Sequence, residues 1–108
     1  MYTYLHNPRC SKSRQGLQLL NEKKVDFKVR EYLKDPLDSN EIISLSEKLN
    51  LPVLKFTRTK ESVYKDCLDE KELIDLMAKN PVLMERPILY DNDKATVGRP
   101  PENFLEIL

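Results

Sequence analysis

The spacing of hydrophobic residues changes period twice in the first third of the chain. Side chains alternate in character over residues 2–6, which is typical of a short β-strand. Residues 11–24 follow a helical period, and Gly16 within them leaves room for close approach of a neighbouring segment. Residues 25–32 alternate again. Strand, helix and strand form a βαβ unit, whose crossover makes the two strands parallel.

The middle of the chain has a helical character and begins at a break, Asp35-Pro36. Asp38 and Glu41 have the spacing of a capping box, so they predict the start of a helix that ends before Leu51-Pro52. Periodicity is weaker over residues 53–69. Residues 69–79 have a helical period again and are followed by Asn-Pro, which stops a helix.

The C-terminal part predicts a hairpin and a last helix. Residues 88–90 form an apolar run, residues 91–93 are turn-forming, and residues 94–97 return, so these two strands should be antiparallel. Pro100 and Pro101 introduce the last helix, since proline is tolerated in a first turn.

The order β α β, helices, β β α predicts a single α/β domain spanning residues 1–108. Its four-stranded mixed sheet has the thioredoxin-like arrangement. The core is expected over about residues 1–34 and 86–108, and a helical insertion over about residues 35–85.

Composition excludes several classes of protein. Lysine plus arginine and aspartate plus glutamate number 18 each, and this zero net charge argues against nucleic acid as a partner. No apolar run reaches membrane length, and no secretory leader opens the chain. The two cysteines form neither a disulfide framework nor a zinc motif, and one histidine makes a metal site improbable. A cytoplasmic protein without a bound cofactor is expected.

Cys10 is the first candidate for chemistry. It lies in the turn between the first predicted strand and helix, close to the helix N-terminus and to several cations. Unpaired N–H groups and the positive end of the helix dipole favour an anion there, and a thiolate is an anion. A lowered pKa would make Cys10 a nucleophile. The alternative is that Cys10 is a small buried hydrophobe, as many free cysteines are.

Arginines in three later loops complete the candidate site. Arg58, Arg86 and Arg99 come from separate segments, and the last two precede proline in loops expected near Cys10. Guanidinium groups suit tetrahedral oxyanions because they stay charged and present a planar fork. Each could instead be an ordinary surface arginine. We interpret the other nearby arginines as solvated or helix-surface charges; these are Arg9, Arg14 and Arg30.

Taken together, four motifs resemble the glutaredoxin-dependent arsenate reductases, and in particular the short reductase-like branch of that family. The match covers essentially the whole chain. Its motifs are His6-Asn7-Pro8-x-Cys10-x-x-Ser13-Arg14, Arg58-x-Lys60-Glu61, Arg86-Pro87-Ile88 and Gly98-Arg99-Pro100-Pro101-Glu102.

The resemblance implies a role for each matched residue. Cys10 corresponds to the nucleophile that attacks arsenate, and the arginines that correspond to oxyanion-binding groups are Arg58, Arg86 and Arg99. Glutathione would be the co-substrate that attacks the thiol–arsenate adduct, and glutaredoxin the partner protein that resolves the mixed disulfide as arsenite leaves.

Supporting roles follow from the same resemblance. His6 corresponds to a histidine that helps to depress the cysteine pKa, although a lone histidine at a strand end is often a packing residue. Pro87 matches the cis-proline position of thioredoxin-like folds. From the residues alone, Ser13 could hydrogen-bond the thiolate or substrate, or cap the helix. Cys67 matches no motif; we interpret it as a half-buried structural thiol, with a resolving cysteine as the alternative.

Other functions compete with arsenate reduction. A glutathione-linked thiol oxidoreductase could use the same nucleophile on another substrate. A redox regulator that contacts RNA polymerase commonly carries C-x-x-C at this site, but Ser13 replaces the second cysteine here. A phosphatase-like arsenate reductase is excluded, because that mechanism needs an arginine where this chain has Gly16.

Overall fold

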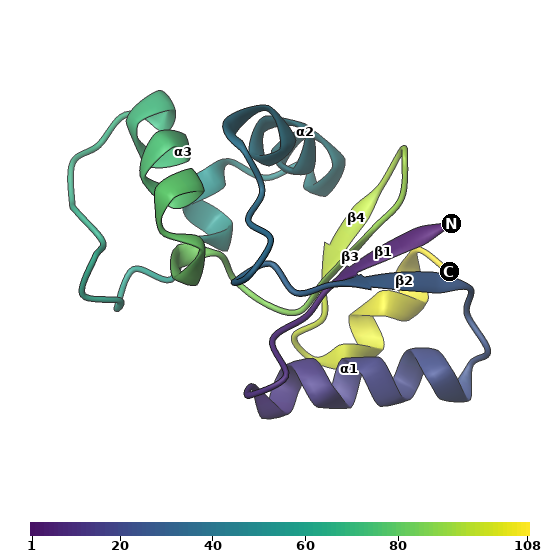
Figure 1. The fold of residues 1–108 in the computed structure, drawn as a ribbon. Coiled ribbons are helices and arrows are strands. Elements are labelled where there is room, and N and C mark those ends of the chain that lie inside the picture. The colour runs from purple at the N-terminus through teal and green to yellow at the C-terminus, as the bar shows by residue number, and fades with distance from the viewer.

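A four-stranded mixed sheet, with strand order β2-β1-β3-β4, forms the centre of the computed structural model, which describes residues 1–108 (Figure 1). β1 (Tyr2–Leu5) pairs in parallel with β2 (Phe27–Arg30). On its other side β1 pairs antiparallel with β3 (Ile88–Tyr90), which pairs antiparallel with β4 (Ala95–Val97). The predicted α/β, thioredoxin-like class is confirmed.

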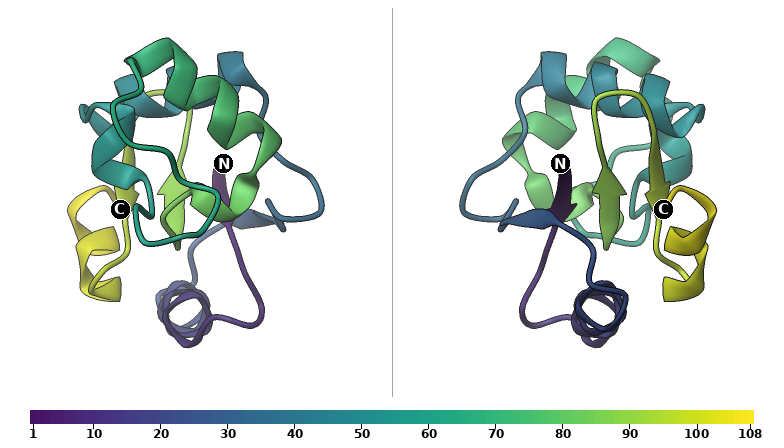
Figure 2. Two further views of the ribbon diagram at one scale, coloured as in Figure 1. Left: turned by 90° about the vertical axis from the view of Figure 1, so that its left-hand side faces the viewer. Right: turned by 90° about the vertical axis from the view of Figure 1, so that its right-hand side faces the viewer.

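Helices cover both faces of this sheet (Figures 1 and 2). One face carries α1 (Ser11–Glu22) and the 3₁₀ helix η3 (Pro101–Glu106), which contact each other. The residues between β2 and β3 form the helices on the other side: α2 (Ser39–Leu49), η1 (Val53–Phe56), α3 (Glu70–Lys79) and η2 (Pro81–Leu83).

Side chains of the central strands alternate between two hydrophobic clusters. Tyr4 of β1 and Leu89 of β3 belong to the cluster that faces α1, together with Leu20 and Phe104. Their chain neighbours, Leu5 and Ile88 among them, belong to the larger cluster. This cluster faces the helices between β2 and β3, which we call the helical segment. Because β1 and β3 are central strands, both of their faces are buried, so these helical layers hold the sheet from both sides.

β2 and the last helix differ from the sequence predictions. β2 ends at Arg30 rather than near Tyr32, since its only ladder partner, β1, ends at Leu5 and offers just one further contact, from the backbone N–H of His6 to the carbonyl of Arg30 at 3.0 Å. The last helix is a short 3₁₀ segment, in which the N–H of Asn103 donates to the carbonyl of Pro100 at 3.0 Å.

The predicted capping box at the start of α2 is present. Asp38 accepts a hydrogen bond from the backbone N–H of Glu41, and the Glu41 side chain accepts one from the N–H of Asp38. Asp69 and Glu72 form the same motif at the start of α3. These reciprocal bonds satisfy orphan donors and fix where both helices begin.

Arg30 is not a solvated charge, and that part of the sequence interpretation is wrong. Its Nη1 lies 2.6 Å from Oε2 of Glu41, and its Nε and Nη2 donate to the carbonyls of Asp35 and Pro36. The interpretation failed because the partners come from later segments that only the fold brings to β2. Arg30 therefore fastens the sheet edge to α2.

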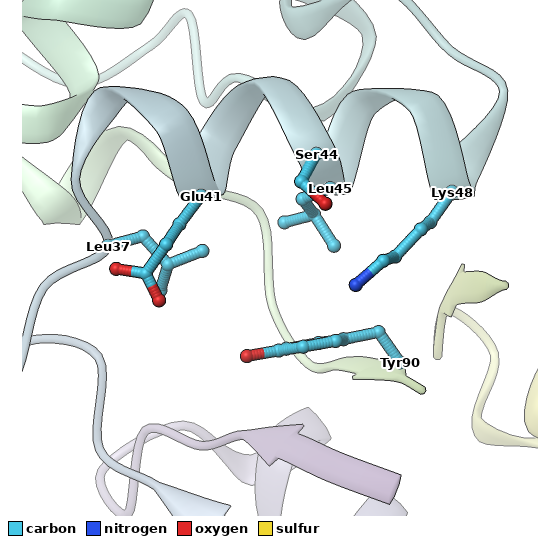
Figure 3. Close-up of a pocket in the computed structure, with 6 residues that line it drawn as sticks. All are labelled: Leu37, Glu41, Ser44, Leu45, Lys48 and Tyr90. Carbon is cyan, nitrogen blue, oxygen red and sulfur yellow. The ribbon is translucent and has the colours of Figure 1, made fainter. Parts of the chain in front are cut away.

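A small cavity of about 100 Å³ lies between α2 and β3 (Figure 3). The ammonium of Lys48 sits over the Tyr90 ring, 5.0 Å from its centroid, in a cation–π contact. No cysteine lines this cavity. It is a feature of the packing between α2 and the sheet.

Candidate active site

The register of the sheet brings three loops to one end. Leu5, Ile88 and Val97 are neighbours across β1, β3 and β4. Because β3 runs antiparallel to both neighbours, the loop that follows β1 and carries Cys10 lies beside the segment before β3 and the segment after β4. These two segments carry Arg86 and Arg99.

Arg58 reaches the same place from the helical segment. Thr57 and Met84 form an isolated antiparallel bridge. On either side of it, the N–H of Arg58 donates to the carbonyl of Leu83 at 2.7 Å, and the N–H of Glu85 donates to the carbonyl of Phe56 at 2.8 Å. This bridge sets Arg58 opposite the chain that leads into Arg86.

One cavity of about 400 Å³ contains all three arginines. None of its lining residues is hydrophobic; they are Thr57, Arg58, Thr59, Lys60, Glu61, Glu85, Arg86 and Arg99. Four cations and two carboxylates therefore face the cavity, and this polar, cationic lining suits a small anion. Cys10 is not among the lining residues and adjoins the cavity through Arg86.

Cys10 occupies the N-cap position of α1 and is half-buried. Burial by itself raises the pKa of its thiol, but the backbone N–H of Ser13, the positive charge of Arg86 and the N–H of Lys12 together act more strongly and hold the pKa below its ordinary value. A larger fraction of Cys10 is therefore ionised to the thiolate near neutral pH than of a free cysteine.

The loop that presents Cys10 is fastened by its own hydrogen bonds. The N–H of Cys10 donates to the carbonyl of Asn7 at 3.0 Å, and the N–H of Arg9 to Oδ1 of Asn7 at 3.1 Å. Nη1 of Arg14 donates to the carbonyl of Pro8 at 2.9 Å. Arg14, which the sequence interpretation left as a helix-surface charge, thus ties α1 back to this loop.

Ser13 and His6 lie buried beneath the loop. Oγ of Ser13 lies 2.6 Å from Nδ1 of His6 and accepts a hydrogen bond from the N–H of Asn7 at 2.9 Å. The hydroxyl therefore binds the loop, while the backbone N–H of Ser13 faces Cys10. Burial lowers the pKa of His6, so the imidazole is neutral near pH 7 and adds no positive charge there.

Pro87 follows Arg86 through a cis peptide bond, and the bond between Arg99 and Pro100 is also cis. The carbonyl of Pro87 accepts a hydrogen bond from the N–H of Gly98 at 2.9 Å. Both arginines are thus anchored by backbone pairing at the start of β3 and the end of β4.

Two further residues lie at this site that sequence reasoning missed. Tyr32 is buried near Arg86, Arg58 and Cys10, and burial raises the pKa of its phenol to about 12, which keeps it protonated. Glu85 lines the cavity among the arginines. No local signal marks Tyr32, whereas the position of Glu85 directly before Arg86-Pro87 was a signal that could have been used.

Cys67 is exposed, not half-buried as the sequence interpretation had it. It lies in the loop before α3 with a positive φ of 63°. The apolar contacts of that loop come from its neighbours, Tyr64 and Leu68, so the thiol is left at the surface. Both cysteines are free thiols.

No group of three or more histidine, cysteine, aspartate or glutamate side chains is arranged to hold a metal ion. None of the helices combines the length and hydrophobicity needed to cross a lipid bilayer.

The thioredoxin-like sheet places a cysteine at the N-cap position of α1, beside an arginine-lined cavity, and comparison with known proteins identifies the family. The ArsC family model matches residues 5–107, so the chain belongs to the ArsC family. An arsenate reductase of Haemophilus influenzae is 41% identical, over 95% of this chain and 95% of that protein. The uncharacterized protein YfgD of Escherichia coli is 46% identical, over 95% of this chain and 92% of that protein.

A solved structure shows the same fold. The arsenate reductase from Vibrio cholerae superimposes with a TM-score of 0.94 at 38% identity, and the alignment covers 99% of this chain and 97% of that one. The predicted family is thereby confirmed.

Proposed function

We propose that this protein is an oxidoreductase that reduces arsenate to arsenite, with Cys10 as its nucleophile. Membership of the ArsC family and the arsenate reductases among its relatives support the substrate. The cavity lined by Arg58, Arg86 and Arg99 is the proposed arsenate site, because these guanidinium groups are its principal anion-binding groups.

The position of Arg86 is the observation that carries this proposal. Its guanidinium lies beside the sulfur of Cys10 and also lines the cavity. Its Nε is buried and has no hydrogen-bond partner. A buried donor without a partner is costly, so the guanidinium of Arg86 has hydrogen-bonding capacity that the protein itself leaves unused. One residue thus binds both the nucleophile and the oxyanion.

The proposed chemistry begins with attack of the Cys10 thiolate on arsenic. A sulfur–arsenic bond forms, and an arsenate oxygen leaves as water after taking up protons. Arg58, Arg86 and Arg99 stabilise the charge on the remaining oxygens. Glutathione then attacks this adduct. The electron pair of the sulfur–arsenic bond passes to arsenic, so As(V) becomes As(III) while two thiols are oxidised to one disulfide.

Completion of the cycle requires a second thiol donor. We propose that glutaredoxin resolves the mixed disulfide, in a reducing compartment such as the cytoplasm, where both cysteines remain thiols. His6 and Ser13 support the reaction by holding the Cys10 loop, since their hydrogen bonds go to each other and to Asn7. Pro87 supports it by fixing the chain that follows Arg86. No bound cofactor, nucleic acid or membrane takes part in this scheme.

Production of arsenite from arsenate with glutathione, glutaredoxin and NADPH tests the proposal. Cys10→Ser should abolish turnover, and Arg58→Ala should reduce it on the order of a hundredfold, as removal of one charge-stabilising donor does. Cys67→Ser is the matched control, because it removes an exposed thiol outside the cavity, and it should retain activity.

Absence of turnover in the unmodified protein, with Cys10 still titrating as a low-pKa thiolate, would eliminate arsenate as the substrate. A glutathione-linked thiol oxidoreductase with another oxidised substrate would then be the better description of the site.

A further inference from the structure

A carboxylate lies inside the arginine-lined cavity. Oε1 of Glu85 is 3.3 Å from Nη1 of Arg86 and 3.4 Å from Nε of Arg99. It also accepts a hydrogen bond from the backbone N–H of Arg86 at 3.3 Å. All three contacts fall on Oε1, which leaves Oε2 to accept a hydrogen bond from a bound anion.

The position of this carboxylate is fixed by its surroundings. The N–H of Glu85 donates to the carbonyl of Phe56 at 2.8 Å, and Arg99 is itself held by a hydrogen bond from its Nε to the carbonyl of Arg86 at 2.8 Å. An anion that binds Arg86 and Arg99 together therefore meets a negative charge held between them.

Tetrahedral oxyanions differ in how they meet such a charge. Arsenate and phosphate retain a proton near neutral pH, so each can donate a hydrogen bond to a carboxylate. Sulfate has the same shape but no proton, so it brings only lone pairs and negative charge to that carboxylate. Like charges at hydrogen-bonding distance repel, and a carboxylate facing an acceptor is left unsatisfied.

We infer that Glu85 is a specificity residue that admits protonated tetrahedral oxyanions and rejects sulfate. The inference rests on the proposed function, because it takes the arginine-lined cavity as the oxyanion site. The arginines supply affinity for any of these anions, and Glu85 supplies the repulsive element that separates them. Sulfate therefore would not compete with arsenate for the cavity beside Cys10.

Glu61, the other carboxylate of the cavity, is placed differently. It pairs only with Arg58, three residues before it, at 3.0 Å. Glu85 alone bridges two of the arginines, including the one beside Cys10. Discrimination between anions is therefore assigned to Glu85.

Calorimetric titration with phosphate and with sulfate tests this inference without turnover, because thiols reduce neither anion. The unmodified protein should bind phosphate at least about tenfold more tightly than sulfate, as expected for one partly exposed charge a few ångströms from the anion. Glu85→Gln removes the charge at nearly the same shape and should bring the two affinities within about twofold, mainly by tightening sulfate. Glu106→Gln, an exposed position outside the cavity, makes the same change in net charge and should keep the original ratio.

The outcomes separate this inference from the proposed function. Equal affinity for phosphate and sulfate in the unmodified protein, or an unchanged ratio in Glu85→Gln, would overturn the role of Glu85 and leave arsenate reduction standing. A ratio that collapses in Glu85→Gln alone, in a protein that yields no arsenite, would support the role of Glu85 and overturn the proposed function. Failure of both anions to bind would overturn the role of Glu85 together with the assignment of this cavity as the oxyanion site.

Discussion

Nδ1 of His6 and Oγ of Ser13 lie 2.6 Å apart beneath the loop that presents Cys10. Both residues are buried, and the same hydroxyl accepts the N–H of Asn7. Loop, strand end and helix therefore share one small polar cluster. Since buried polar groups are costly when one partner is lost, the ionisation of His6 should be tied to the stability of the folded chain.

We expect stability to fall when His6 is protonated. Burial lowers its pKa in the folded state below the ordinary value of 6.5, so the unfolded chain takes up a proton more readily as the pH falls through 6.5. The free energy of unfolding should thus decrease as the pH falls below about 6.5. Urea titrations between about pH 8 and pH 5 would measure it.

His6 is the only histidine, which makes the assignment direct. Cys10 also has a lowered pKa and would add its own pH dependence near neutrality, so the comparison is made in a Cys10→Ser background, where His6→Gln should remove most of the pH dependence in that window. The carboxyl groups with lowered pKa, Glu41 and Asp91, have ordinary values of 4.5 and 3.8, so their stabilisation is lost only at lower pH. An NMR titration midpoint at or above 6.5 for His6 would contradict the prediction.

Replacing Arg86 should make Cys10 less reactive. The Arg86 charge is one of the interactions that hold the pKa of Cys10 down, and Arg86→Gln removes it. Only the thiolate reacts with iodoacetamide, so the alkylation rate follows the fraction of ionised Cys10. We expect the rate at neutral pH to fall by about tenfold, because loss of the charge should weaken the ionisation of the thiol by about that factor. The rate is measured against pH in a Cys67→Ser background, because Cys67 is exposed and would also react.

Arg9→Gln is the control for this experiment. Arg9 is adjacent to Cys10 in sequence but exposed, and its charge is not among the causes of the lowered pKa. Equal slowing in both variants would mean that general positive charge, rather than contact with Arg86, activates the thiol.

Arg30→Met should destabilise the protein through its link between β2 and α2. The change breaks the contact with Glu41 and the hydrogen bonds to the carbonyls of Asp35 and Pro36. We expect a loss of about 1–2 kcal/mol in the free energy of unfolding, less than for a fully buried pair because Glu41 is partly exposed. Arg30→Lys should recover only part of it, since lysine lacks the planar fork. Equal stability of Arg30→Lys and the unmodified protein in urea would show that charge alone is sufficient.

Gly16→Ala should also lower stability, although alanine favours helices. A methyl group at Gly16 would overlap the Tyr4 hydroxyl and would lie 2.9 Å from Cε2 of Phe104 and 3.3 Å from Cγ of Pro87. Overpacking of about 1–3 kcal/mol should outweigh the roughly 1 kcal/mol of helix propensity gained. Gln15→Ala, at the exposed neighbouring position, should not destabilise in the same urea titration. A stabilised Gly16→Ala protein would mean that the Tyr4 and Phe104 rings move aside at little cost.

Local patterns predicted the elements and their order because the forces behind them act over a few residues. Alternation at β1 and the capping box of Asp38 and Glu41 are readable in the sequence, and each lies where it was predicted. The need for a small residue at Gly16 was also anticipated, and the crowding around it agrees.

Long-range contacts were beyond such reasoning. Arg30 pairs with a glutamate on a helix that the sheet register does not determine, and Tyr32 becomes buried only when the helical segment packs on the sheet. At the candidate site, the resemblance supplied the arginine positions, whereas Glu85 enters the cavity through the bridge between Thr57 and Met84. Pairing of distant segments cannot be derived from local spacing.

The arginines of the cavity come from two parts of the molecule, and this has a thermodynamic consequence. Arg58 belongs to the helical segment, while Arg99 follows a strand of the sheet, so an anion held by both cross-links two parts of the molecule. By mass action, such a ligand stabilises the arrangement in which these parts are docked and raises the melting temperature with its concentration. Arsenate or phosphate would then hold the helical segment against the sheet for as long as it is bound. Occupancy of the cavity should therefore slow the exchange of amide protons in the helical segment.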